Sequence, residues 1–138
     1  MNLAHCFLKF DRKDWPRGFT FVEMMIVVAI IALLMSITIP NLLKARMTAD
    51  DASAQAILKT IAAALENYAA VNNVYPTNPN DLIGVTPPYL NENYFSGPHN
   101  GFTFSYFLAD YDYTIVAAPI SGTSGTRSYS ITTGAVFH

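Results

Sequence analysis

The stretch RGFTFVEMMIVVAIIALLMSITIP, residues 17–40, decides the fold of this 138-residue chain. From Phe19 to Ile39 it is apolar at every position except Thr20, Glu23, Ser36 and Thr38. At about 1.5 Å per residue, a helix over this segment is roughly 30 Å long, which is the thickness of the hydrocarbon core of a bilayer. The segment therefore predicts a membrane-spanning helix with one carboxylate just inside its start.

Basic residues on the two sides of the apolar segment predict its orientation. Four precede it and two follow it, namely Lys9, Arg12, Lys13 and Arg17, and then Lys44 and Arg46. Because the larger basic cluster stays in the cytoplasm, we expect the amino terminus inside and the carboxyl terminus outside. A cleaved secretory signal peptide has a shorter apolar stretch and a clean break after it, whereas here the pattern continues into helical sequence.

The sequence after the apolar segment predicts that the helix continues. Neither glycine nor proline occurs from Asn41 to about Val71, and apolar residues recur every three or four positions at Ala54, Leu58, Ile61, Leu65 and Tyr68. Asp51 and Glu66 are expected largely on the other faces of this amphipathic half. We predict one helix from about Phe19 to about Val71.

Pro40 lies inside this predicted helix, near the outer boundary of the membrane segment. Proline has no N–H to donate, and its ring clashes with the preceding turn. We therefore expect a kink or local melting of the turn from Ser36 to Pro40, which makes this turn a bend or an extensible hinge.

The remainder of the chain predicts a loop followed by a small sheet. Residues 73–101 are rich in proline, asparagine and glycine, which is typical of loops, with one helical turn near residues 80–83. Aromatic and β-branched runs then predict three antiparallel strands at 102–108, 111–118 and 127–133, with a short fourth at 135–137. The apolar stripe of the helix is the large surface available to cover this sheet. The fold class is therefore α+β, a long helix packed against a small antiparallel β-sheet.

The stretch quoted above resembles the signature of type IV pilins and of the pseudopilins of type II secretion systems. The shared features are Gly18, Phe19, Thr20, Glu23, the long apolar run and Pro40. The resemblance implies a pilin-like fold, cleavage by a prepilin peptidase between Gly18 and Phe19, and methylation of the new amino terminus on Phe19. It also implies that Thr20, Glu23 and Pro40 serve assembly, with Glu23 of an incoming subunit pairing with the Phe19 amine of a neighbour.

The same resemblance divides the chain into a leader and two further parts. Residues 1–18 are the prepilin leader peptide, and residues 19–40 are the transmembrane and assembly half of the helix. Residues 41–138 are a periplasmic or extracellular head, made of an amphipathic helix (41–72), a loop (73–101) and a β-sheet (102–137). The expected location is the inner membrane, as a single-pass protein with a cytoplasmic amino terminus and a periplasmic carboxyl terminus, and then a pilus or pseudopilus.

The function that the resemblance implies is that of a structural subunit of a type IV pilus-like filament. Expected partners are further copies of the chain, related minor pilins, the prepilin peptidase, and an assembly ATPase with an inner-membrane platform protein. Two alternatives stay open: a pseudopilin of a type II secretion system, and a single-pass membrane-anchored binding domain that does not polymerise. The loop APISGTSGTRSYS (118–130) lacks the acidic calcium-binding residues of the major pseudopilins, which favours a pilin.

Other side chains indicate no catalytic, metal or cofactor site. The serines of the carboxyl-terminal loop have no histidine and acid in a recognisable arrangement with them, and the pairs Asp50-Asp51 and Asp110/Asp112 are of the kind that water usually solvates. The formal net charge is −2 and the basic residues after the apolar segment are scattered, so nucleic acid is not expected as a direct partner. Cys6 is the only cysteine, which excludes an intrachain disulfide. We expect neither an enzyme nor a bound cofactor.

Overall fold

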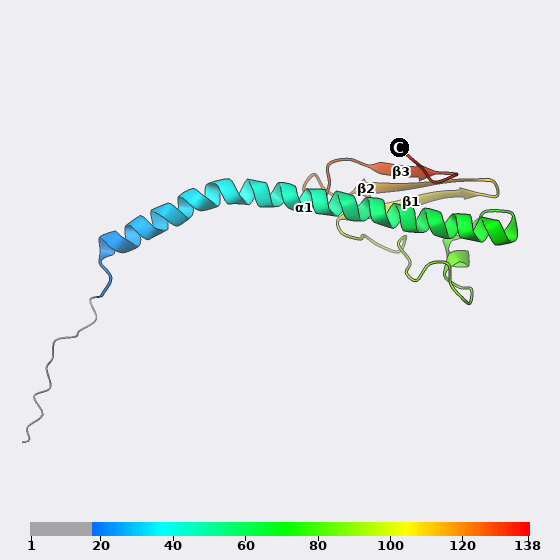
Figure 1. Ribbon diagram of the computed structural model, residues 1–138, viewed down its shortest axis with the longest axis horizontal. Coiled ribbons are helices and arrows are strands. Elements are labelled where there is room, and N and C mark those ends of the chain that lie inside the picture. Colours follow the sequence, from blue (N-terminus) through cyan, green and yellow to red (C-terminus); the bar gives the residue numbers. More distant parts are fainter. Residues whose placement is uncertain (1–17) are drawn as a thin grey trace, which may run out of the picture. The chain divides into compact units, whose positions relative to one another are not determined.

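The computed structural model describes residues 18–138, so the predicted leader up to Arg17 lies outside the described residues. The elements are the helix α1 (Phe21–Asn72), the short 3-10 helix η1 (Pro79–Leu82), and the strands β1 (Phe102–Ala109), β2 (Asp112–Pro119), β3 (Tyr129–Thr132) and β4 (Val136–Phe137) (Figure 1). The predicted α+β class, with one long helix and a small antiparallel sheet, is confirmed.

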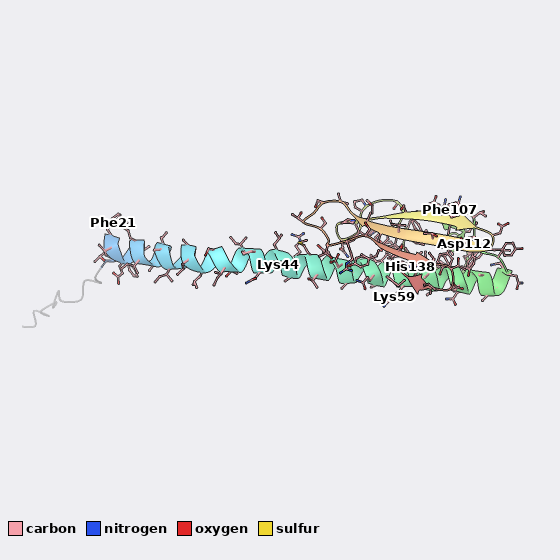
Figure 2. The ribbon with its side chains drawn as sticks, turned by 90° about the horizontal axis from the view of Figure 1, so that it is seen from above. Phe21, Lys44, Lys59, Phe107, Asp112 and His138 are labelled. Atoms are coloured by element: carbon pink, nitrogen blue, oxygen red, sulfur yellow. The ribbon has the colours of Figure 1, made fainter. Side chains whose placement is uncertain are left out.

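The chain divides into two units, residues 1–37 and 38–138, and α1 contributes to both. In the first unit every residue from 21 to 37 is exposed, and side chains project from all sides of the helix (Figure 2). Large apolar side chains in this segment are 45–78% exposed. By length and composition α1 can cross a membrane. An apolar helix exposed on all sides needs lipid or protein around it.

The helix α1 continues through Pro40 without a break. The expectation that the turn from Ser36 to Pro40 melts is therefore wrong for this structure. A proline removes one N–H donor from the helical ladder, and the turns before and after it are helical here. Within this turn, Ser36 Oγ donates a hydrogen bond to the Leu33 carbonyl at 2.7 Å.

The second unit buries the apolar stripe of α1 against the sheet. Ala54, Leu58, Ile61 and Leu65 are each at most 1% exposed, which confirms the stripe predicted from the sequence. The strands β1, β2 and β3 run alongside this half of the helix (Figure 1). Their buried residues are Phe102, Phe104, Tyr113, Ile115, Ala117 and Ile131. Burying one leucine or isoleucine side chain contributes about 1.5–3 kcal/mol, so this contact dominates the stability of the unit.

The four strands pair antiparallel in chain order, β1-β2-β3-β4. Phe104 lies opposite Ala117, and Ile115 lies opposite Ile131. Alternate residues of β2 enter the core, together with the first half of β1 and Ile131 of β3. β3 begins two residues later than the predicted run, and Thr126, just before that run, is hydrogen-bonded to Asp51 of α1.

The loop between α1 and β1 is fixed to the core by two leucines. Leu82 in η1 and Leu90 are 0% and 2% exposed. The backbone N–H groups of Tyr89 and Leu90 both donate to the Leu82 carbonyl, at 2.8 and 3.0 Å. η1 confirms the helical turn predicted near residues 80–83, and the Asn78 side chain caps it. These contacts tie the part of the loop from Leu82 to Leu90 to the core.

Candidate assembly site

Thr20 and Glu23 form a reciprocal capping box at the start of α1. The Glu23 backbone N–H donates to Thr20 Oγ1 at 3.2 Å, and the Thr20 backbone N–H donates to Glu23 Oε2 at 3.3 Å. The Thr20 hydroxyl also donates to Glu23 Oε2, at 3.4 Å. Two backbone N–H groups at the helix start, where carbonyl partners are missing, are satisfied in this way.

The capping role of Glu23 is one that the sequence analysis missed. Its signal is local, because a threonine followed three residues later by glutamate, ahead of an apolar run, indicates a capping box. The box has particular value in lipid, where water is not available to satisfy the first N–H groups of a helix. It also keeps the carboxylate at the first turn, where the helix dipole favours negative charge.

Glu23 keeps one carboxylate oxygen for a second partner. Among residues 18–138 its side chain bonds to Thr20 through Oε2, and Oε1 accepts no hydrogen bond. Phe19 precedes Thr20 and is 79% exposed. An amine created on Phe19 by cleavage would therefore lie one residue from the capping box.

The other predicted site residues lie on either side of this box. Gly18 precedes α1, and a Cβ built on it has no heavy atom of the described residues within 4 Å. The backbone at the predicted cleavage position is therefore open. Pro40 lies within α1 in the second unit. Of the predicted residues, Thr20 and Glu23 are the pair in direct contact.

In the second unit, Asp51 anchors the loop between β2 and β3 to the helix. Asp51 is 7% exposed, and its carboxylate accepts hydrogen bonds from the Thr126 N–H at 3.1 Å and from Thr126 Oγ1 at 2.6 Å. The expectations that it lies on an outer face and that water solvates it are both wrong. A buried carboxylate is tolerated where donors satisfy it. Asp51 also precedes Ala54 by three residues and Leu58 by seven, which is the spacing of the buried stripe.

Gly125 lets this loop approach the core closely. A Cβ at this position would lie 2.3 Å from Phe102 Cζ and 3.0 Å from Asp51 Oδ1. Phe102 is fully buried, so its ring has no space to move into. Packing therefore requires glycine at 125, whereas Gly122 in the same loop has open space around it.

Glu66 joins α1 to three other parts of the second unit. Its carboxylate accepts hydrogen bonds from Tyr113 Oη at 3.0 Å, from Tyr75 Oη at 3.1 Å and from the Gly134 N–H at 3.0 Å. Ala135 N–H donates in turn to Tyr113 Oη at 3.2 Å. The expected outward position of Glu66 is therefore wrong, because the carboxylate turns toward donors from a strand, a loop and a turn.

The tyrosines that contact Glu66 hold their protons strongly. Burial, followed by the hydrogen bond to Glu66, raises the pKa of Tyr113 far above the ordinary tyrosine value. The same two causes, in the same order, raise the pKa of Tyr75. A phenolate would lose its donor and face the carboxylate with like charge. The two rings also pack edge to face, with centroids 5.0 Å apart.

Comparison with known proteins places the capping box inside a recognised motif. Residues 16–39 match the prokaryotic N-terminal methylation motif. The matched segment contains Gly18, Phe19, Thr20 and Glu23, and it ends one residue before Pro40.

Curated relatives include pilus and secretion-system proteins. The chain is 44% identical over 69 residues to the type IV wide pilus major component PilA4 of Thermus thermophilus, covering 50% of this chain and 53% of that protein. It is 36% identical over 85 residues to type II secretion system core protein G of Escherichia coli K12, covering 59% of each. It is 38% identical over 71 residues to the type IV major pilin protein PilA of Myxococcus xanthus, covering 51% of this chain and 32% of that protein.

The long capped helix, the small sheet and the matched motif define a chain with a prepilin-type amino-terminal segment. The resemblance to type IV pilins and type II secretion pseudopilins is confirmed. The chain spans about half the length of the curated relatives that it matches.

Proposed function

We propose that this chain is a structural subunit of a type IV pilus-like filament, which polymerises through residues 19–40 after cleavage between Gly18 and Phe19. The observation that carries the proposal is the apolar segment 21–37, which is exposed throughout and has Glu23 as its one charged side chain. Relatives named as a wide pilus component and a major pilin support it. Those names describe filament components, and we propose no enzymatic activity.

The apolar segment has to exchange one apolar environment for another during assembly. Exposing it to water would cost about 1.5–3 kcal/mol for each large side chain, which forbids an aqueous intermediate. Exchange of lipid for neighbouring copies of the same helix avoids this cost. Ala29, Ala32 and Ser36 allow close approach of such helices. The Ser36 hydroxyl adds no unsatisfied donor, because it bonds to the Leu33 carbonyl.

Glu23 selects the neighbour in this proposal. Cleavage after Gly18 creates a positive amine on Phe19, and both this amine and the carboxylate are costly in hydrocarbon unless they are paired. Glu23 can keep its contact with Thr20 through Oε2 and, through Oε1, accept a hydrogen bond from the Phe19 amine of a neighbouring copy. Fixing the register of an assembly is the best-attested role of a buried charged pair.

The proposal includes the machinery and location that such a filament needs. A prepilin peptidase cleaves and methylates the chain, and an assembly ATPase with an inner-membrane platform protein extracts it from the bilayer. Further copies of the chain and related minor pilins are its partners in the filament. Before assembly it is a single-pass inner-membrane protein, with its amino terminus in the cytoplasm and its head in the periplasm.

A second candidate is a pseudopilin of a type II secretion system. The similarity to core protein G favours it, because that relative aligns with 59% of this chain. The two candidates share processing and polymerisation. They differ in where the filament lies, which is the cell surface for a pilus and the periplasm for a pseudopilus.

Mass spectrometry of filaments sheared from native cells tests the proposal. We expect a mature chain that begins with N-methylated Phe19 and is a filament component. The same mature chain in periplasmic assemblies, without surface filaments, would select the pseudopilin. An uncut chain that stays monomeric after detergent extraction would contradict both and leave a membrane-anchored binding domain.

A further inference from the structure

A shallow pocket lies between the loop that precedes β1 and β1 itself, within the second unit. Its cavity volume is about 180 Å³. Its lining includes Asn78, Asn80, Asn93, Phe95, Ser96 and Tyr106. None of the residues assigned to assembly lines it, so its chemistry calls for a separate explanation.

Two aromatic rings line this pocket. Phe95 and Tyr106 pack edge to face, with ring centroids 4.9 Å apart and an interplanar angle of 69°. Tyr106 is 48% exposed, although Phe104, two residues earlier on the same side of β1, is buried. An exposed ring that a second ring holds in place is a rigid surface on which an apolar face can stack.

The polar side chains of the pocket are fixed by the loop itself. Asn78 Oδ1 accepts from the Asn80 N–H, and Asn93 Oδ1 accepts from the Phe95 N–H, each at 3.0 Å. Holding these oxygens also fixes the amide N–H groups, which have no acceptor among the described residues. Ser96 Oγ donates to the Asn93 carbonyl at 3.0 Å, which leaves its lone pairs as acceptors. The pocket thus combines oriented donors with an acceptor.

Among the described residues, no charged side chain lines the pocket. The charged residues adjacent in sequence are Asp81, next to Asn80, and Glu92, next to Asn93, and both are exposed. A described lining with neither a cationic nor an anionic side chain gives no direct partner to an anion or to a cation. The chemistry suits a neutral ligand with many hydroxyl groups and one apolar face.

We propose that this pocket binds a neutral saccharide through one pyranose ring. The apolar face of the sugar stacks on Tyr106, while its hydroxyl groups accept from the amides of Asn78 and Asn93 and donate to Ser96. The cavity is smaller than the roughly 300 Å³ at which pockets for larger ligands begin. One ring therefore fills it, and we expect a Kd on the order of 1 mM. This binding is independent of filament assembly.

Saturation-transfer difference NMR on the full chain tests the proposal. The chain is held in dodecylphosphocholine micelles, because a detergent with a sugar headgroup would compete. The neutral probes are methyl β-galactoside, methyl β-glucoside and methyl N-acetyl-β-glucosaminide, and sialic acid is the anionic comparison. We expect saturation transfer to at least one neutral probe and none to sialic acid.

Variants then locate the binding. Tyr106→Ala should weaken it by about tenfold, the upper range for one aromatic contact, whereas Tyr106→Phe keeps the ring and the affinity. Asn93→Asp keeps the oxygen that holds the loop, removes the N–H donors and should also weaken binding. Tyr111→Ala is the matched control, because Tyr111 is 79% exposed and outside the pocket.

Three results would overturn the proposal. They are no transfer to any neutral probe, equal affinity in Tyr106→Ala and Tyr111→Ala, and sialic acid binding as well as the neutral sugars. Filament formation is measured separately, so failure here leaves the proposed structural function untouched.

Discussion

Glu23 and Thr20 satisfy each other's backbone N–H groups, so the residue proposed for assembly also caps the helix that carries it. The two roles make different demands on the side chain. A cap needs an acceptor oxygen, which glutamate and glutamine both supply. Pairing with an amine in an apolar environment needs a negative charge. Substitution at this one position can therefore separate the roles.

Glu23→Gln keeps the cap and removes the charge. We expect normal insertion into the membrane and a filament yield at least about tenfold lower, which corresponds to a loss of about 1.4 kcal/mol or more. Glu23→Ala loses both roles and should assemble no better. The measurement is the amount of chain in the sheared filament fraction, relative to the amount in the membrane fraction.

Thr20→Ser is the matched control for this experiment, because it keeps the hydroxyl that caps the helix. Its filament yield should equal that of the parent chain. If Glu23→Gln assembled normally while Glu23→Ala did not, the cap alone would account for Glu23, and pairing with the Phe19 amine would have to be abandoned.

Asp51→Ala should destabilise the second unit by about 1–3 kcal/mol, because it removes the hydrogen bonds that the Thr126 N–H and hydroxyl donate to a carboxylate that is only 7% exposed. The measurement is a denaturant titration of the full chain in micelles, followed by near-ultraviolet circular dichroism. The control is Asp50→Ala, which removes a 4.0 Å pair with Arg46 on the same helix and should cost at most about 0.5 kcal/mol. If the destabilisations caused by Asp51→Ala and Thr126→Ala simply added in the double variant, the 2.6 Å hydrogen bond between the two side chains would contribute nothing to stability.

Gly125→Ala tests the close packing of the same loop. The new Cβ would lie 2.3 Å from Phe102 Cζ, and overpacking of this kind costs about 1–3 kcal/mol. Gly122→Ala, where the Cβ meets open space, should leave stability unchanged or slightly higher. The measurement is the thermal unfolding midpoint of both variants. Equal midpoints would mean that the loop can shift to accommodate the new Cβ without loss of stability.

The sequence predicts the elements of this fold well because their signals are local. The apolar run and the stripe from Ala54 to Leu65 predict α1, and the aromatic and β-branched runs predict the strands within two residues or so. The capping box was equally local and could have been identified from Thr20 and Glu23 alone.

The inward positions of Asp51 and Glu66 were not predictable in this way. A prediction from helix polarity places carboxylates on the outer face, unless hydrogen-bond donors inside the fold are known in advance. Those donors are distant in sequence, since Thr126 lies 75 residues after Asp51 and Tyr113 lies 47 residues after Glu66. Only the folded sheet brings them together. The pocket proposed to bind a saccharide could not be predicted from the sequence for the same reason, because its lining comes from both the loop and β1.

Because the pKa of Tyr113 is raised, the stability of the second unit should fall as the pH rises in the alkaline range. Its folded pKa lies above the unfolded value of about 10. Above pH 10 the unfolded chain therefore releases its proton before the folded chain does. The contribution to stability is complete below about pH 10, and it is lost as the pH rises through the window between the two values.

Tyr113→Phe should show a lower stability at neutral pH, because it removes the hydroxyl that bonds to Glu66 and Ala135, and a shallower decline above about pH 10. Denaturant midpoints measured across this range give both quantities. Tyr111→Phe is the control, since Tyr111 is 79% exposed, and its decline should match that of the parent. Parallel declines in the parent and in Tyr113→Phe would show that the buried tyrosine does not govern the alkaline transition.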